Sequence, residues 1–194
     1  MQSNCDQKIS TFCCANPEKP MPMCIDLDGT LIRGDVTIYA IKKYCVAGGF
    51  RNLLRLFLWF LRGRAHLKHM LAKSVALDPS AMDYNRELLD FIQQKKKIGH
   101  KIFLTTACDE IYANKIADFL GVFDGVFASD GIVNLRAKAK MDALVLIFGE
   151  KNFIYAANSV DDVCVWEKSA DCIMVNPTKS ALRKMKNMQY CLFP

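Results

Sequence analysis

Two carboxylates stand close together near the start of this 194-residue chain, in Cys24-Ile25-Asp26-Leu27-Asp28-Gly29-Thr30-Leu31. Side chains alternate between faces along a strand, so Asp26 and Asp28 are expected to point to the same side. Two like charges held this close are unfavourable unless a cation or a shared proton accompanies them. The pair therefore indicates a metal site, an acid/base pair or both. An ordinary strand that runs into an Asp-Gly turn is the simpler alternative.

Other polar groups follow later apolar runs: Thr105-Thr106, Lys138 and Lys140, and Asn158-Ser159-Val160-Asp161-Asp162. The carboxyl ends of parallel strands meet at one edge of a sheet, where ligands bind. Carboxylates, hydroxyls and an amine gathered there suit phosphoryl transfer. One carboxylate attacks phosphorus, a metal screens negative charge, and lysine and hydroxyl groups hold the phosphate oxygens.

The elements that must position these groups alternate along the chain. Apolar runs predict strands over residues 23–27, 101–104, 125–128, 153–157 and 172–175. Helical spacing and stop signals predict helices over residues 36–47, 64–77, 85–97, 109–120, 141–148, 160–168 and 178–186. Such alternation is typical of βαβ units. We therefore expect an α/β fold, a Rossmann-like three-layer structure around a parallel sheet.

Composition sets the broad class. Hydrophobic residues make up 52% of the chain and charged residues 24%, which indicates a globular protein. The net charge of +6 is concentrated in one segment, because no acidic residue lies between Asp35 and Asp78 and eight basic residues do. We expect this segment to face something anionic.

The N-terminal residues 1–22 lack a basic stretch followed by an apolar core, which argues against a signal peptide. The nine cysteines form no C-x-x-C pair and are odd in number, which favours reduced thiols and a cytoplasmic protein. We expect residues 1–22 to be a poorly ordered leader. The apolar run of residues 50–61 is too short to span a bilayer, which needs about 20 residues.

The motif D-x-D-G-T-L at Asp26 resembles that of the haloacid dehalogenase (HAD) superfamily, and the resemblance covers roughly residues 23–176. It implies a phosphatase in which Asp26 forms an aspartyl-phosphate. Asp28 is then the general acid and base. By the same resemblance, Thr106 and Lys140 bind phosphate, with Thr105 and Lys138 as their rivals.

The resemblance also implies Mg²⁺ as cofactor, with Asp26, Asp28, Asp162 and Asn158 as the metal-binding residues and Asp161 as the rival of Asp162. The family usually has Gly-Asp where this chain has Ala157-Asn158. An amide oxygen can bind a hard cation but brings no charge, so weaker magnesium binding is one expected consequence.

Three segments are similar to HAD domains that are joined to UbiA-type prenyltransferases: residues 155–166, Arg62-Gly63-Arg64-Ala65 and Ala128-Ser129-Asp130-Gly131. The asparagine is native in those domains, and the chain is then part of a longer protein. A weaker resemblance is to bacterial effector protein tyrosine phosphatases of the same superfamily.

The resemblance implies three parts: a leader (1–22), a core (23–33 and 100–194) and a small helical, basic cap (34–99). The expected substrate is a phosphoprotein bearing phosphotyrosine, or else a small metabolite or a prenyl or lipid phosphate. A module of low activity that docks on a membrane or a partner is the alternative of another class. The basic cap suits an anionic membrane surface, and no nucleic acid is expected. The expected location is cytoplasmic, peripheral on membranes, or secreted into a host cell.

A rival chemistry lies within the cap segment. Cys45 and Arg51 match C-x5-R, the signature of cysteine-based tyrosine phosphatases, in which a thiolate attacks phosphorus. That loop must follow a strand and open a helix. The preceding residues have helical spacing, which favours a chance match.

Overall fold

A sheet of six parallel strands, in the order β3-β2-β1-β4-β5-β6, forms the centre of the computed structural model, which describes residues 20–193. The strands are β1 (Met23–Ile25), β2 (Ile102–Asp109), β3 (Gly125–Ser129), β4 (Ile154–Ala157), β5 (Asp171–Val175) and β6 (Cys191–Phe193). Met23 on β1 lies opposite Ile102 and Ile154 on its two neighbours. The central strands are covered on both faces, which explains why they are continuous apolar runs.

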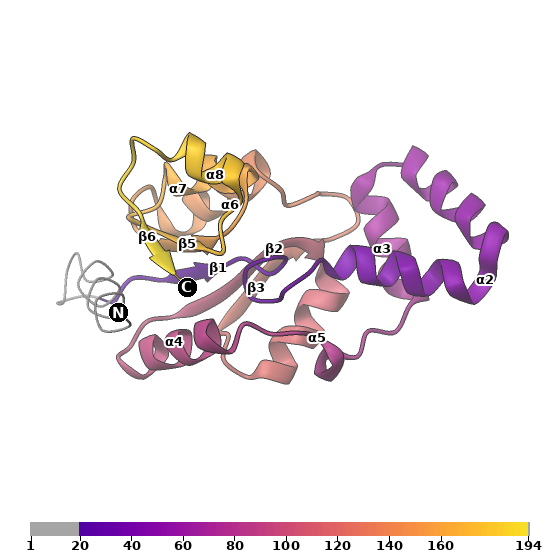
Figure 1. Cartoon of the computed structure of the whole chain (residues 1–194), viewed down its shortest axis with the longest axis horizontal. Coiled ribbons are helices and arrows are strands. Elements are labelled where there is room, and N and C mark those ends of the chain that lie inside the picture. The colour runs from indigo at the N-terminus through magenta and orange to yellow at the C-terminus, as the bar shows by residue number, and fades with distance from the viewer. Residues whose placement is uncertain (1–19, 194) are drawn as a thin grey trace.

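Helices cover both faces of this sheet (Figure 1). The helices of the structure are α2 (Val36–Leu61), α3 (Arg64–Ser74), α4 (Arg86–Lys97), α5 (Glu110–Leu120), α6 (Lys138–Phe148), α7 (Val163–Trp166) and α8 (Lys179–Lys184), with 3-10 turns η1 (Pro79–Ala81) and η2 (Val160–Asp162). Helices α4 and α5 lie on one face, and α6, α7 and α8 lie on the other. Each face has its own apolar core. The predicted three-layer α/β fold is confirmed.

Polar residues that precede the helices cap them. The side chains of Asp35, Asn85, Asp109 and Thr178 each accept a hydrogen bond from a backbone N–H in the first turn that follows. Gly121 ends α5 in the left-handed conformation that glycine adopts without strain. These caps fix where each helix leaves the sheet edge.

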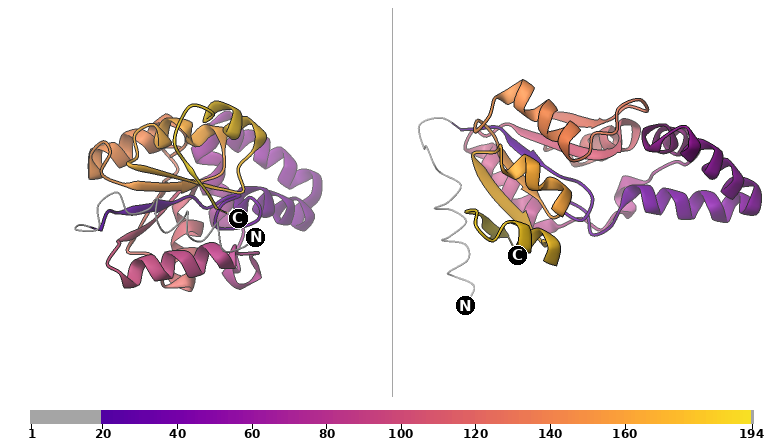
Figure 2. Two further views of the ribbon diagram at one scale, coloured as in Figure 1. Left: turned by 60° about the vertical axis from the view of Figure 1, so that its left-hand side comes forward. Right: turned by 90° about the horizontal axis from the view of Figure 1, so that it is seen from above.

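The helices α2 and α3 project beyond the sheet as a cap (Figures 1 and 2). The sequence predicts that the first helix ends before Gly48-Gly49. In the structure the helix continues past these glycines, with a kink at Gly49 (φ 52°, ψ −136°) inside α2. The projecting part includes fewer residues than the predicted cap of residues 34–99. Helix α4 lies against the sheet and contributes Leu88 and Ile92 to its apolar core.

Contacts from α3 tie the cap to the core. The Tyr112 hydroxyl on α5 donates to the carbonyl oxygens of Leu71 and Val75 at 3.2 and 2.9 Å. His69 Nδ1 lies 3.0 Å from an Asp109 carboxylate oxygen at the end of β2. The base of the cap is therefore fixed to the strand that ends at the predicted site.

Strand β6 is absent from the sequence prediction. It has three residues and lies at the sheet edge beyond β5, so no apolar periodicity announces it. The predicted leader falls almost wholly outside the described residues. Within residues 20–193, no helix combines the length and the apolar character needed to cross a membrane.

Candidate active site

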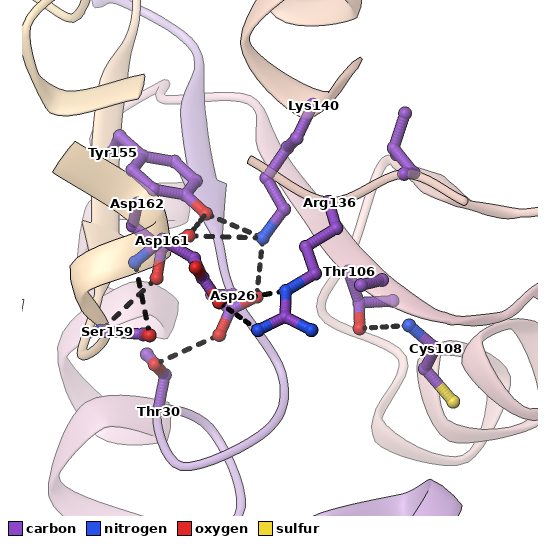
Figure 3. A network of polar contacts seen from close by, with 12 residues as sticks. Asp26, Thr30, Thr106, Cys108, Arg136, Lys140, Tyr155, Ser159, Asp161 and Asp162 are labelled. Carbon is purple, nitrogen blue, oxygen red and sulfur yellow. Dashed lines mark hydrogen bonds and ion pairs between the residues drawn. The ribbon is translucent and has the colours of Figure 1, made fainter. Parts of the chain in front are cut away.

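Asp26 follows the last residue of β1 and is held at the sheet edge from three sides (Figure 3). Its backbone N–H donates to Ala156 O at 2.9 Å. Thr30 Oγ1 donates to one carboxylate oxygen at 3.3 Å, and Lys140 Nζ donates to the other at 2.7 Å. Asp26 is only 7% exposed. Burial raises its pKa to about 6 despite the Lys140 charge, because the neighbouring Asp162 charge adds to the effect of burial.

Asp28 faces the cap. One of its carboxylate oxygens accepts the Val36 N–H at 2.8 Å, at the first residue of α2. Burial, followed by the charges of Asp35 and Asp26, raises the pKa of Asp28 to about 7. A carboxyl group with this pKa can both give and take a proton near neutral pH.

Lys140 comes from the first turn of α6, whose preceding residue, Ala137, adopts a positive φ of 48°. Its Nζ also lies 2.8 Å from the Tyr155 hydroxyl and 3.3 Å from an Asp162 carboxylate oxygen. Burial lowers the lysine's pKa, but the two carboxylates outweigh it and the net shift is upward. Of the two predicted lysines, Lys140 lies beside Asp26. Lys138 is exposed and pairs with Asp142.

Asp162 is turned toward Lys140. Its Oδ1 accepts the Tyr155 hydroxyl at 2.7 Å, and its Oδ2 accepts the Ser159 N–H at 3.2 Å in a capping box around η2. Both oxygens thus have protein partners. The arrangement positions the Lys140 ammonium against Asp26, whereas a metal-binding role for Asp162 stays a prediction.

Asn158 lies on the turn between β4 and η2, and Asp161 lies within η2. A Cβ added at Gly29, whose φ is +77°, would lie 2.2 Å from the Asn158 amide nitrogen. Glycine at position 29 therefore leaves room for the Asn158 side-chain amide beside the turn that follows Asp26. Asp161 is paired with Arg136, whose Nε donates to it at 2.8 Å across the mouth of the site (Figure 3).

The two threonines of β2 are fully buried. Thr106 Oγ1 accepts the Cys108 N–H at 2.9 Å, where the pairing of β2 with β3 shifts register. A cavity opens beside Asp26 and Asp28, and it is lined by the neighbouring Ala107 and not by Thr106. The phosphate-binding role of Thr106, and its preference over Thr105, stay predictions.

No known protein-family model matches the chain. A protein of Sinorhizobium fredii, the uncharacterised y4nM, is 34% identical over 158 residues, which are 81% of this chain and 30% of that protein. The chain therefore spans less than a third of that relative's length.

Solved structures share the fold at low identity. A Bordetella pertussis Tohama I protein of unknown function superposes with a TM-score of 0.69 at 16% identity, over 91% of this chain and 99% of its own. A phosphoserine phosphatase, solved as a phospho-aspartyl intermediate analogue, superposes with a TM-score of 0.60 at 19% identity, over 90% and 93%. A HAD family hydrolase from Salmonella enterica superposes with a TM-score of 0.61 at 13% identity, over 85% and 66%. The chain shares the fold of these solved structures.

Within this fold, a cavity of about 630 Å³ opens between the sheet edge and the cap. Its charged lining consists of Asp26, Asp28, Asp35, Asp161, Asp162, Lys68, Arg136 and Lys140. When all are ionised, five carboxylates face three cations and the formal charge is −2. A phosphate dianion entering this cavity needs further positive charge. A bound divalent cation would supply that charge.

The carboxylates of the cavity do not form a metal-binding cluster by themselves. Within the described residues, no three His, Cys, Asp or Glu side chains form a group that could hold a metal ion. The carboxylates of Asp28 and Asp162 are turned to Val36 and to Lys140 and Tyr155. Both carboxylate oxygens of Asp26 are engaged as well, by Thr30 and Lys140. The side chains that could hold a metal are the four predicted ones, Asp26, Asp28, Asp162 and Asn158, all of which line the cavity. The full predicted set stays a prediction.

Three site residues escaped the sequence analysis: Arg136, Tyr155 and Lys68. Tyr155 is one residue of an apolar strand, and Arg136 is a single basic residue in a loop, so neither carries a signal. Lys68 is one of eight basic residues in the cap segment. Its Nζ reaches Ala107 O at 2.5 Å and Asn134 Oδ1 at 3.0 Å, and burial lowers its pKa.

The rival cysteine site does not form. Cys45 and Arg51 both lie within α2, on either side of the Gly49 kink. No strand leads into this segment, so the backbone cannot form the phosphate-binding loop that the C-x5-R signature requires. Arg51 is exposed on the cap.

Proposed function

We propose that this chain is a magnesium-dependent phosphomonoester hydrolase that works through an aspartyl-phosphate on Asp26. One observation carries the proposal. A buried carboxylate at the end of the central strand lies 2.7 Å from a buried ammonium, and a second carboxyl group of pKa about 7 follows two residues later. The HAD fold shared with phosphoserine phosphatases supports the same assignment.

In the first step, an Asp26 carboxylate oxygen forms a bond to phosphorus and the ester oxygen leaves. Protonated Asp28 gives its proton to that leaving oxygen. Lys140 holds Asp26 in place and compensates its charge, and Asp162 with Tyr155 holds Lys140. The products are the free alcohol and the aspartyl-phosphate.

In the second step, Asp28, now ionised, takes a proton from a water molecule whose oxygen attacks the same phosphorus. Inorganic phosphate leaves and the Asp26 carboxylate is restored, while Asp28 is again protonated. Mg²⁺, when bound, supplies positive charge that screens the phosphate from the surrounding carboxylates. Asp26, Asp28, Asp162 and Asn158 are the side chains that would hold it.

For the substrate, we propose a phosphotyrosine side chain of a protein. The cavity of about 630 Å³ is roomy enough for an aryl phosphate, and its mouth carries Arg136 and Lys68 beside a basic cap. A small metabolite phosphate or a prenyl phosphate is the competing substrate. A longer protein, with a prenyltransferase partner domain or as a secreted effector, is compatible with the length of the Sinorhizobium relative.

The test is hydrolysis of an aryl phosphate, a phosphotyrosine peptide and a prenyl phosphate, with Mg²⁺ and with EDTA. Wild type, Asp26→Asn and Cys45→Ser are compared, and acid-quenched protein is examined for a phosphoryl label that hydroxylamine removes. Loss of activity and label in Asp26→Asn alone supports the proposal. Activity that survives Asp26→Asn, or that depends on Cys45, refutes it. A protein inactive on all three substrates favours the docking module.

A further inference from the structure

The second half of α2 exposes an apolar strip that the fold leaves uncovered. The strip consists of Phe50, Leu53, Leu54, Phe57, Leu58 and Leu61, each 51% exposed or more, with Phe50 at 82%. Figure 1 shows this half of the helix at the outer end of the cap, away from the sheet. Large apolar groups gathered in this way mark a surface that binds something.

The strip occupies one side of the helix. At about 100° per residue, its six positions fall within an arc of roughly 140°. Asn52 and Leu56, which are buried, lie on the opposite side and face the rest of the cap. The helix is therefore anchored by one face while the other is presented to the surroundings.

A row of arginines borders the strip on one side. Arg51, Arg55 and Arg62 fall within about 40° of one another around the same helix, directly beside Leu58. All three are exposed. Arginines in this place can lay their alkyl stems along an apolar layer and keep their guanidinium groups at a charged boundary.

We propose that this face of α2 docks on an anionic membrane surface, with the strip in the headgroup–acyl boundary and the arginines at the lipid phosphates. An apolar face with a basic border is the pattern of helices that lie in the membrane interface. The surrounding segment supports this partner, because residues 36–77 contain eight basic residues and no acidic one.

The same charges argue against the strip of a second copy as the partner. Two strips packed face to face by a twofold axis would place the basic borders of both copies near one interface. No acidic side chain within residues 36–77 could pair with them. An acidic lipid surface offers the compensating charge without such repulsion.

The test is co-sedimentation of the full chain with vesicles of phosphatidylcholine, alone or with about one third phosphatidylserine. We expect binding to the anionic vesicles. Binding falls at least about tenfold in Leu54→Gln/Phe57→Gln and in Arg51→Glu/Arg55→Glu. All four side chains are exposed, so the unfolding midpoint should stay within a few degrees of wild type.

The matched control is Leu146→Gln/Ile147→Gln on α6, where both side chains are also exposed. This variant should bind vesicles like wild type. So should Asp26→Asn, since the docking does not depend on the proposed catalysis. Failure of wild type to bind anionic vesicles, or equal losses in the α6 control, would overturn the proposal. The proposal would also be overturned if light scattering showed a dimer of the wild type that only the strip variants dissociate.

Discussion

Replacing Lys140 with methionine removes the ammonium that lies 2.7 Å from Asp26 and 3.3 Å from Asp162 while keeping a side chain of similar length. Asp26 and Asp162 are 7% and 4% exposed, so water cannot replace the lost charge. Breaking a buried ion pair by removing one partner costs about 3–5 kcal/mol of stability. We expect Lys140→Met to lose that amount of stability at pH 7.5, together with the proposed phosphatase activity.

The loss should be smaller at pH 5. The pKa of Asp26 is raised to about 6, so at pH 5 much of this carboxyl group is protonated and needs no counter-charge. Lys140 has an upward-shifted pKa and stays charged across this range, so the pH dependence comes from Asp26. The destabilisation by Lys140→Met therefore grows as the pH rises through about 6.

The measurement is urea unfolding of wild type, Lys140→Met and Lys138→Met at pH 5 and pH 7.5. Lys138 is the matched control because it lies two residues away on α6 and pairs with Asp142 in solvent. Its replacement should cost well under about 1 kcal/mol. Equal losses of stability for the two lysine variants would refute the argument that Lys140 compensates buried carboxylates. So would a loss below about 1 kcal/mol for Lys140→Met at pH 7.5.

Two further predictions concern Asp28. The unfolded carboxyl has a pKa near 3.8 and the folded one about 7, so ionisation opposes folding increasingly from about pH 4 to pH 7. Asp28→Asn keeps an acceptor for the Val36 N–H and should raise stability at pH 8 by about 2–4 kcal/mol, with little gain at pH 4 and a loss of turnover, as thermal unfolding and kinetics can show. Asp35→Asn keeps the helix cap but removes a charge that raises the pKa of Asp28. The alkaline limb of kcat/KM should then move to lower pH by up to about one unit, whereas Asp78→Asn, which changes a similar cap on η1, should leave the profile unchanged.

Much of the core could be predicted because its strands are buried on both faces. Such strands must be apolar, and the first polar residue after each one marks the sheet edge. This rule locates Asp26 after β1 and Asn158 after β4, but it fails at β2, which continues through Thr105 and Thr106. Lys140, expected just before a helix over residues 141–148, lies in the first turn of α6. Strand β6 escapes the rule because an edge strand of three residues is too short to show a pattern.

Other parts depend on packing that sequence spacing does not encode. The two apolar halves of α2 are recognisable, but Gly49 could end a helix or only kink it, and the choice depends on contacts made by the second half. Arg136 reaches Asp161 from a loop 25 residues away. Tyr155 belongs to an apolar strand, and only the structure shows that its hydroxyl contacts Lys140. Contacts between residues so distant in the sequence depend on the order of the strands in the sheet, which residue spacing does not encode.

The hydrogen bond from the Val36 N–H to Asp28 joins the cap to the proposed chemistry. Val36 is the first residue of α2, so the positive end of that helix dipole lies at the carboxyl group and favours its ionised form. Asp35, one residue earlier, opposes this by its charge. A shift of α2 relative to β1 would change both influences at once, and with them the fraction of Asp28 that carries a proton. The cap is therefore part of the proposed acid–base machinery, because the turn that begins its first helix also orients the group proposed to move the proton.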